Sequence, residues 1–238
     1  MSETAIVFLG VAVFAAGFGF LFWKMTQPSR RLYKLLGDGS RAGLRLIRPE
    51  MPEWSYLPHH LAPFLGESGK DYKPGLAYQF AGGEGYLLSI VEIVKLIRKK
   101  EYRRGEVVVR RVATGLDSPF TLHLRKAPGQ LPGVAKKLLA GLLPKEAGLS
   151  QFLPEMRESF VAYGERAALP EPVQRTLVTA LDPNGFDLAK RLANTSGLRF
   201  YPEGIRFPIS YYKRPKSVAD VRRILDFVEE LARGFRFQ

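Results

Sequence analysis

The stretch at residues 66–71 comes nearest to a phosphate-binding loop. Such a loop needs a glycine five positions before Gly69, and it needs Ser or Thr after the lysine to hold Mg²⁺. Phe64 and Asp71 occupy those two positions. The glycine-rich residues 82–85 could present amide groups to an anion, but they lack the spacing of a dinucleotide loop. We therefore interpret both stretches as turns, without a bound nucleotide.

Metal ligation and nucleophilic catalysis find equally little support. The three histidines are His59, His60 and His123, and there is no cysteine. A zinc site needs three or four converging ligands, and no acidic residue lies at helical spacing from the adjacent pair. A Gly-x-Ser-x-Gly elbow is also absent from the sequence. The sequence thus predicts no catalytic, cofactor-binding or metal residue and no cofactor.

An uninterrupted apolar segment opens the chain. Residues 5–23 contain no charged side chain, and nineteen helical residues rise roughly 28 Å, close to the ~30 Å hydrocarbon core of a bilayer. A soluble helix of this length would show a polar face. A signal peptide would begin with positive charge and end at a small-residue cleavage site, whereas here Glu3 precedes the segment and Lys24 follows it. Residues 1–24 are therefore predicted to be an uncleaved transmembrane helix.

Small residues recur along this segment at the spacing of a helix face. The pairs Ala12/Ala16 and Ala15/Gly19 would let another membrane helix approach closely, where packing drives association. The alternative is that Ala and Gly are simply common in membrane helices. We expect Ala12, Ala15, Ala16 and Gly19 to pack against a partner helix.

The charges beyond the segment predict its orientation. Residues 24–48 hold seven basic side chains and one acidic side chain. Because basic flanks stay on the cytoplasmic side, we expect a single-pass protein of the inner membrane. Its N-terminus would lie outside and everything after Trp23 would be cytoplasmic.

The remainder predicts a connection followed by a folded α+β domain. Residues 25–63 are rich in Pro, Gly and Arg and are interpreted as a largely extended juxtamembrane connection, with a short helix at 29–36. Residues 64–238 form the basic domain. The apolar residues 86–100 are expected to form a core helix, or alternatively a helix in the membrane interface. Strands at 106–114 and 120–124 are expected to form a hairpin.

The second half shows the same order of elements. Strands at 198–201 and 205–210 flank the turn Pro202-Glu203-Gly204, and a helix at 218–234 begins with the capping box of Ser217 and Asp220. Other expected elements are a strand at 160–163 and helices at 133–143, 172–181 and 186–194. Two similar hairpin-plus-helix lobes, 64–150 and 151–238, would indicate a duplication; the alternative is that this arrangement is a common way to build an α+β domain.

The formal net charge of +13 predicts anionic partners. For a tethered domain the nearest anionic surface is the lipid headgroup layer; acidic partner subunits are the next alternative. No RNA- or DNA-binding motif appears, so nucleic acid is an unlikely partner. The residues expected to face the anionic surface are Arg30, Arg31, Lys34, Arg98, Lys99, Lys100, Arg103 and Arg104.

Together these features predict a non-catalytic accessory or scaffold subunit of a larger membrane complex, of the respiratory, photosynthetic, secretion or transport type. The first alternative is a membrane-tethered module that binds an anionic ligand or nucleic acid. The second is a membrane-bound enzyme whose residues converge only in the fold.

The basic residues next to the apolar segment are expected to contact anionic lipid, and Arg30 and Arg31 test this expectation. Replacing Arg30→Glu and Arg31→Glu should weaken contact with anionic liposomes or disturb the topology, because each Lys or Arg near such a surface contributes ~1 kcal/mol. Binding to anionic liposomes and protease accessibility would measure this. Unchanged behaviour of the double variant would count against the charge argument.

Overall fold

The computed structural model describes residues 32–65, 70–96, 99–124, 146–180, 197–209 and 215–236. Within these ranges no helix has the length and apolar character needed to cross a membrane. The predicted transmembrane helix, with Ala12, Ala15, Ala16 and Gly19, lies outside the described residues. The described part is an α+β domain, as the sequence predicted, and it is built on one antiparallel sheet.

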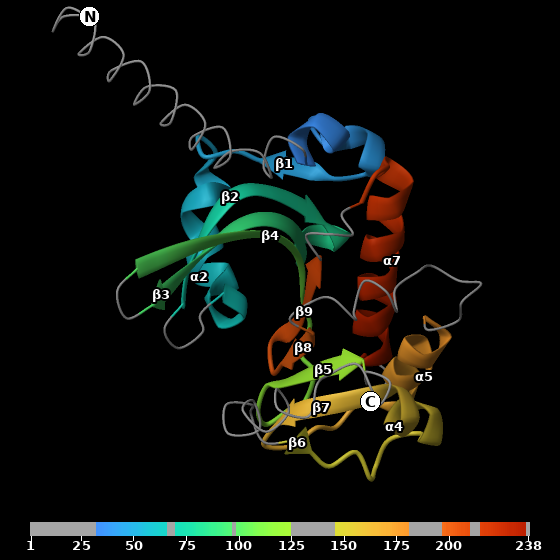
Figure 1. The fold of residues 1–238 in the computed structure, drawn as a ribbon. Coiled ribbons are helices and arrows are strands. Elements are labelled where there is room, and N and C mark those ends of the chain that lie inside the picture. The colour runs from blue at the N-terminus through green and yellow to red at the C-terminus, as the bar shows by residue number, and fades with distance from the viewer. Residues whose placement is uncertain are drawn as a thin grey trace, which may run out of the picture.

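The described residues form a sheet of nine strands in the order β1-β2-β3-β4-β9-β8-β5-β7-β6, with antiparallel neighbours throughout. Strands β1 to β4 form one half of the sheet, and β5, β6 and β7 lie at the other end with the β8–β9 hairpin between them (Figure 1). The bounds are β1 Arg45–Ile47, β2 Lys70–Phe80, β3 Gly85–Leu96, β4 Lys99–Arg111, β5 Phe120–Leu124, β6 Glu146–Ala147, β7 Phe160–Gly164, β8 Leu198–Tyr201 and β9 Gly204–Ile209.

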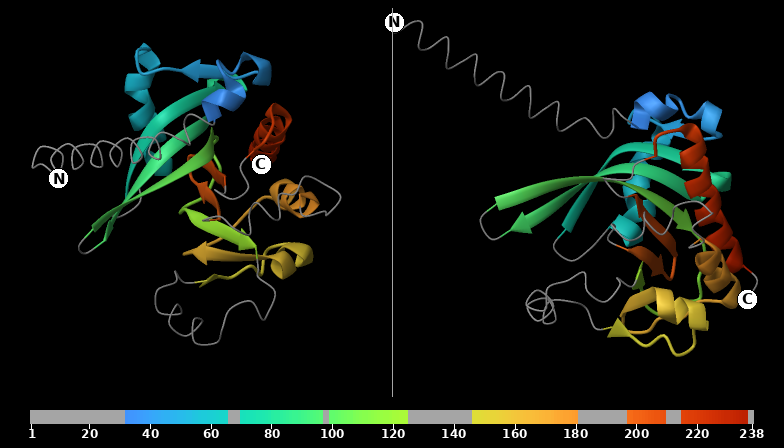
Figure 2. Two further views of the ribbon diagram at one scale, coloured as in Figure 1. Left: turned by 45° about the horizontal axis from the view of Figure 1, so that its top comes forward. Right: turned by 45° about the vertical axis from the view of Figure 1, so that its right-hand side comes forward.

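Helices cover the sheet from both sides. The described helices are α2 Pro52–Leu65, α4 Pro154–Ser159, α5 Glu171–Thr179 and α7 Val218–Gly234, with short 3-10 turns at η1 Ser40–Ala42 and η2 Ala81–Gly83. Residues 32–36 are also helical. We call the side of the sheet that packs against α7 the α7 face, and the side that packs against α2 the α2 face. Figure 2 shows α7 running along the sheet toward α5.

In the strongly apolar stretch 86–100, the described residues 86–96 and 99–100 form strands, so the prediction of a core or interfacial helix there was wrong. They belong to β3 and to the start of β4. Leu87 is buried on the α7 face, while Tyr86 and Leu88 are buried on the α2 face. A strand buried on both faces loses the alternation of apolar and polar residues, and its pattern then matches that of a buried helix.

Helix α2 replaces much of the extended connection predicted for residues 25–63. Its apolar side chains Leu57, Leu61 and Phe64 recur at helical spacing and are fully or almost fully buried against the α2 face. Pro58 and Pro63 lie inside the helix, although each removes a backbone hydrogen bond. The burial of this apolar stripe offsets that loss. Because prolines usually interrupt helices, their presence led to the wrong prediction of an extended segment.

The second hairpin and the last helix follow the sequence prediction. Strands β8 and β9 pair around Pro202 and Glu203. In α7, Ser217 Oγ accepts the backbone N–H of Asp220, and the Asp220 carboxylate accepts the backbone N–H of Ser217. The first predicted hairpin is wrong in its pairing: β4 lies beside β3 and β9, and β5 lies beside β7 and β8.

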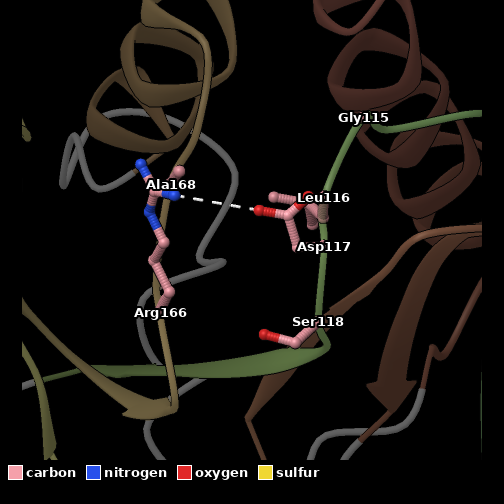
Figure 3. Close-up of a pocket in the computed structure, with 6 residues that line it drawn as sticks. All are labelled: Gly115, Leu116, Asp117, Ser118, Arg166 and Ala168. Atoms are coloured by element: carbon pink, nitrogen blue, oxygen red, sulfur yellow. Dashed lines mark ion pairs between the residues drawn. The ribbon is translucent and has the colours of Figure 1, made fainter.

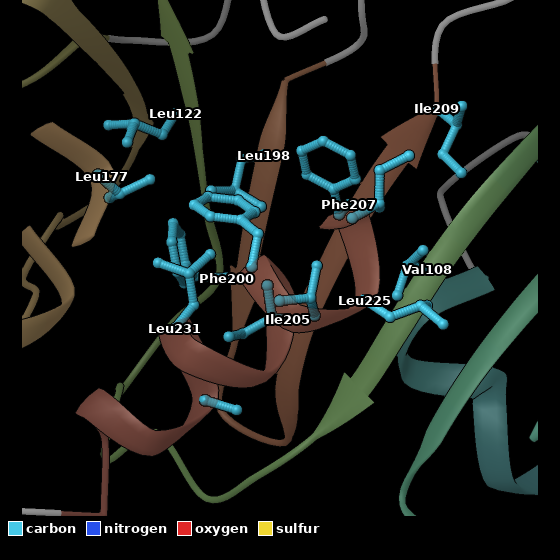
Figure 4. Packing of buried hydrophobic residues seen from close by; sticks show 14 of the residues in the cluster. Val108, Leu122, Leu177, Leu198, Phe200, Ile205, Phe207, Ile209, Leu225 and Leu231 are labelled. Atoms are coloured by element: carbon cyan, nitrogen blue, oxygen red, sulfur yellow. The ribbon is translucent and has the colours of Figure 1, made fainter. Parts of the chain in front are cut away.

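The larger core lies between α7 and the sheet. Phe200 stacks on Phe120 with ring centroids 5.1 Å apart, and Phe207 meets Phe227 of α7 edge-on at 5.9 Å. Figure 4 shows Phe200, Ile205 and Phe207 of the β8–β9 hairpin near Leu225 and Leu231 of α7. The same core continues to α5 through Leu177, and α7 packs against β4, β9 and α5.

One buried ion pair crosses this core. Arg110 of β4 donates from Nε to Glu229 Oε2 of α7 at 2.7 Å, and from Nη1 to the carbonyl of Arg111 at 2.7 Å. The Arg110 side chain is only 3% exposed and that of Glu229 is 20% exposed. Removing one partner would therefore leave a charge buried without its counter-charge.

We expect Glu229→Gln to destabilise the domain by about 3 kcal/mol, because Arg110 would keep its burial and lose its carboxylate. The matched control is Glu230→Gln, one position along α7 and exposed, which should stay within about 0.5 kcal/mol of the parent. Guanidinium unfolding of the full chain in mild detergent measures both. Equal effects of the two variants would contradict the structural role of the pair.

Candidate functional site

Two arginines lie opposite each other on the α2 face, in the middle of the sheet. The register of the β8–β9 hairpin pairs Arg199 with Arg206. Arg206 is also paired with Val109 of β4, whose side chain belongs to the core under α2. Arg206 is 5% exposed and Arg199 is partly buried. The fold thus holds two guanidinium groups side by side at a sheltered position.

Polar side chains extend this pair into a row across the sheet. Thr121 of β5 lies beside Arg199, and Tyr163 of β7 lies beside Thr121. His123 follows two positions along β5, and its ring meets that of Tyr163 edge-on at 5.5 Å. We call Arg206, Arg199, Thr121, Tyr163 and His123 the arginine row. The apolar residues of the same strands face the opposite side, against α5 and α7.

The electrostatics of the row favour an anion. Like charges directly opposite each other in a strand pair repel, and burial together with the charge of Arg206 lowers the pKa of Arg199. A guanidinium nevertheless stays protonated in proteins, so the two positive charges are permanent. Arginine presents several N–H donors in a fixed plane that fits carboxylate and phosphate groups. The row can therefore bind or orient an anionic group.

A second polar cluster lies at the edge of the α2-side core. Arg111 Nη1 is 2.6 Å from His60 Nε2 and 3.5 Å from Glu84 Oε2. Since a guanidinium only donates, His60 accepts and is neutral in this contact. Burial and the charge of Arg111 lower the pKa of His60. Its ring also meets Tyr86 edge-on at 5.8 Å, and burial raises the pKa of Tyr86. The contacts tie α2 to β3 and β4.

Two adjoining hollows lie between the segment after β4 and the segment before α5. They measure about 140 and 190 Å³ and share Gly115, Leu116 and Ala168. Figure 3 shows Arg166 reaching across one of them toward Asp117, at 3.8 Å. Both charged side chains are largely exposed. Pockets for small-molecule substrates are usually about 300–1,000 Å³, so these hollows suit a water cluster or one small side chain.

The predicted anionic-surface residues are only partly placed by the structure. Lys34 is exposed on residues 32–36. The four residues Lys99, Lys100, Arg103 and Arg104 lie in β4, where the register pairs them with Leu96, Lys95, Glu92 and Val91 of β3. Figure 1 shows the far ends of β3 and β4 projecting beyond α2. Arg30, Arg31 and Arg98 lie outside the described residues.

Sequence reasoning missed the arginine row and the contacts of Arg111. The available signal was a charged residue between apolar neighbours in a predicted strand, as in Ile205-Arg206-Phe207. In an ordinary surface strand this alternation indicates a solvated face. Only the pairing of β8 with β9 and β5 shows that Arg199, Arg206 and Thr121 share one line.

A metal site or similarity to known proteins would also guide the assignment of function. Within the described ranges no group of three or more His, Asp or Glu side chains gathers in a way that could hold a metal ion. Comparison with known proteins found no matching family model, no matching curated protein and no matching solved structure. The function of this chain must therefore be inferred from its own residues.

The lowered pKa of His60 predicts a pH-dependent stability. The unfolded chain takes up the proton near the ordinary value of 6.5, before the folded chain does, so acid favours unfolding. That contribution is present above pH 6.5 and is lost as the pH falls through the lower folded pKa. Denaturant midpoints of the full chain between pH 7.5 and 5 should fall more steeply than those of His60→Asn.

His59→Asn is the control, because this neighbouring residue is exposed. It should keep the parent's pH dependence. Identical slopes for the parent and His60→Asn would show that His60 does not titrate differently in the two states.

Proposed function

We propose that the chain is a non-catalytic, single-pass accessory or scaffold subunit of a larger membrane complex, with its α+β domain on the cytoplasmic face of the inner membrane. The observation that carries the proposal is the charge-free segment 5–23 followed by seven basic residues and one acidic residue in 24–48. An apolar segment of this length suits a bilayer, and the basic flank suits its cytoplasmic side.

The charged groups of the described domain support a role in binding anionic partners. The two hollows described above are small, and the arginines of the row are permanently charged groups on an ordered sheet. A sheet packed between helices on both faces presents such groups in fixed positions, which is the requirement for a scaffold. Anionic lipid headgroups and other membrane subunits are the partners we propose.

The finer organisation belongs to the same proposal. Residues 1–24 form the membrane helix, with Ala12, Ala15, Ala16 and Gly19 against a neighbouring helix, and residues 25–31 connect it to the domain, to which β1 and α2 also belong. The described hairpin β8–β9 followed by α7 is one hairpin-plus-helix unit. We retain a duplicated origin of the lobes 64–150 and 151–238 as an interpretation of the sequence.

The second candidate is a membrane-tethered module for an anionic ligand, and the arginine row is the observation that favours it. Arg199 and Arg206 are cross-strand neighbours with restricted exposure. In that case the arginine row would bind a small anionic ligand and not a partner subunit.

Copurification tests the proposal. The full chain, isolated at native expression in mild detergent, should bring down a stoichiometric set of membrane proteins, identified by mass spectrometry. Ala12→Leu combined with Ala16→Leu should release those partners, because bulky side chains prevent close helix approach. Both forms should resist carbonate extraction from membranes.

The matched control is Val7→Leu with Val11→Leu, which has the same spacing on another helix face and should retain the partners. A parent chain that purifies alone would overturn the subunit proposal and favour the tethered module. A chain that carbonate extracts would overturn the membrane anchor itself.

A further inference from the structure

Basic residues that are far apart in the sequence meet at one end of the domain. Helix α7 packs against η1, although about 180 residues separate them along the chain. Arg222 in the second turn of α7 donates from Nη2 to the carbonyl of Arg41 in η1. In Figure 1 the red start of α7 lies beside the blue segment that contains η1. Two basic stretches that the sequence presents separately therefore form one surface.

Five exposed cations define this surface, which we call the α7–η1 surface: Lys34, Arg41, Lys216, Arg222 and Arg223. Tyr33 beside them is 48% exposed. An amphipathic aromatic ring next to basic side chains is typical of positions at the headgroup layer of a membrane.

Acidic groups do not neutralise the surface. Asp38 accepts hydrogen bonds from the side chain and backbone of Ser40, which lower its pKa. Asp220 accepts the backbone N–H groups of Lys216 and Ser217. Asp226 is exposed about one turn beyond Arg222. Five cations thus stand against three carboxylates, which leaves the surface with a net positive charge. The positive end of the α7 dipole adds to the attraction for anions.

The chain brings this surface to the headgroups. Nine residue steps separate Trp23, at the end of the apolar segment, from Leu32, the first described residue. They span about 30 Å when fully extended and about 14 Å as a helix. The surface next to Leu32 and Leu36 is consequently held near the membrane, and an anionic bilayer is the partner always present there.

We propose that the α7–η1 surface docks on anionic lipid headgroups and holds α7 with its N-terminal end toward the membrane. The inference depends on the membrane anchor of the proposed function and adds an orientation to it. Each cation near an anionic leaflet strengthens binding by about fivefold, the equivalent of ~1 kcal/mol. Several together suffice to orient a domain that is already tethered.

The absence of cysteine from the sequence makes a direct test simple. Single cysteines introduced as Ala219→Cys, in the first turn of α7, or Glu230→Cys, eleven residues further, carry the same fluorescent label. The two exposed positions differ by about 17 Å along the helix. The labelled full chain is reconstituted into phosphatidylcholine vesicles with or without phosphatidylglycerol, each containing a lipid with a headgroup quencher.

With phosphatidylglycerol, the label at 219 should be quenched severalfold more than the label at 230. Without it, or at high salt, the difference should shrink, because screening weakens contacts between exposed charges. Adding Arg222→Glu and Arg223→Glu should bring the quenching at 219 down to that at 230. The control pair Arg222→Lys and Arg223→Lys retains the charge and should retain the difference.

Equal quenching at the two positions in anionic vesicles would overturn the docking inference. The same holds for a difference that appears only after partner proteins are added, which would identify an acidic subunit as the occupant. Carbonate extraction of the same vesicles separates the two proposals: a chain that stays in the membrane without quenching contradicts the docking alone. A chain that is extracted contradicts the anchor. Circular dichroism checks that the Glu variants are folded, and Lys34→Glu with Arg41→Glu provides an independent pair.

Discussion

The pairing of strand β9 with both β4 and β8 is the contact on which the rest of the domain depends. All six residues of β9 are buried, and it joins β4 on one side to β8 on the other. Gly204 makes the junction possible: a Cβ there would lie 2.2 Å from the carbonyl oxygen of Arg110. Helix α7 then covers the junction on one side, and the Arg110–Glu229 ion pair fixes it to β4. Without β9, the backbone hydrogen bonds that the described residues form between the β4 side of the sheet and the β8–β9 turn would be reduced to those that Val112 and Thr114 donate to that turn.

This frame places its cations in two different environments. Arg199 and Arg206 lie on the sheet itself, sheltered and opposite each other, and suit recognition of one defined anionic group. The cations around Arg222 and Arg41 are exposed at the end of the domain and suit a broad, fluid surface of negative charge. The two groups of cations therefore suit different kinds of anionic partner.

Local sequence signals predicted some elements well and failed where long-range contacts decide. The capping box of Ser217 and the stripe of α7 depend on neighbouring residues only, as does the turn between β8 and β9, so all three were predictable. Strand β3 was mistaken for a helix because burial on both faces removed its period of two. Strand β2 was not predicted; Pro74 and Gly75 interrupt its pattern, and the register shifts there. The arginine row needed the order of four strands, which no local pattern contains.

The position of β9 near the end of the chain also affects how the protein is made. Strand β4 ends at Arg111, and its partner begins only at Gly204, so more than ninety further residues must leave the ribosome before that edge is covered. Unpaired edges invite association with other chains, and non-local pairing is slow to form. If residues 5–23 enter the bilayer first, each nascent domain remains at the membrane with an incomplete sheet until β9 is synthesised. Lateral spacing between newly made copies, or a chaperone at the exit site, would then protect β4 until synthesis is complete.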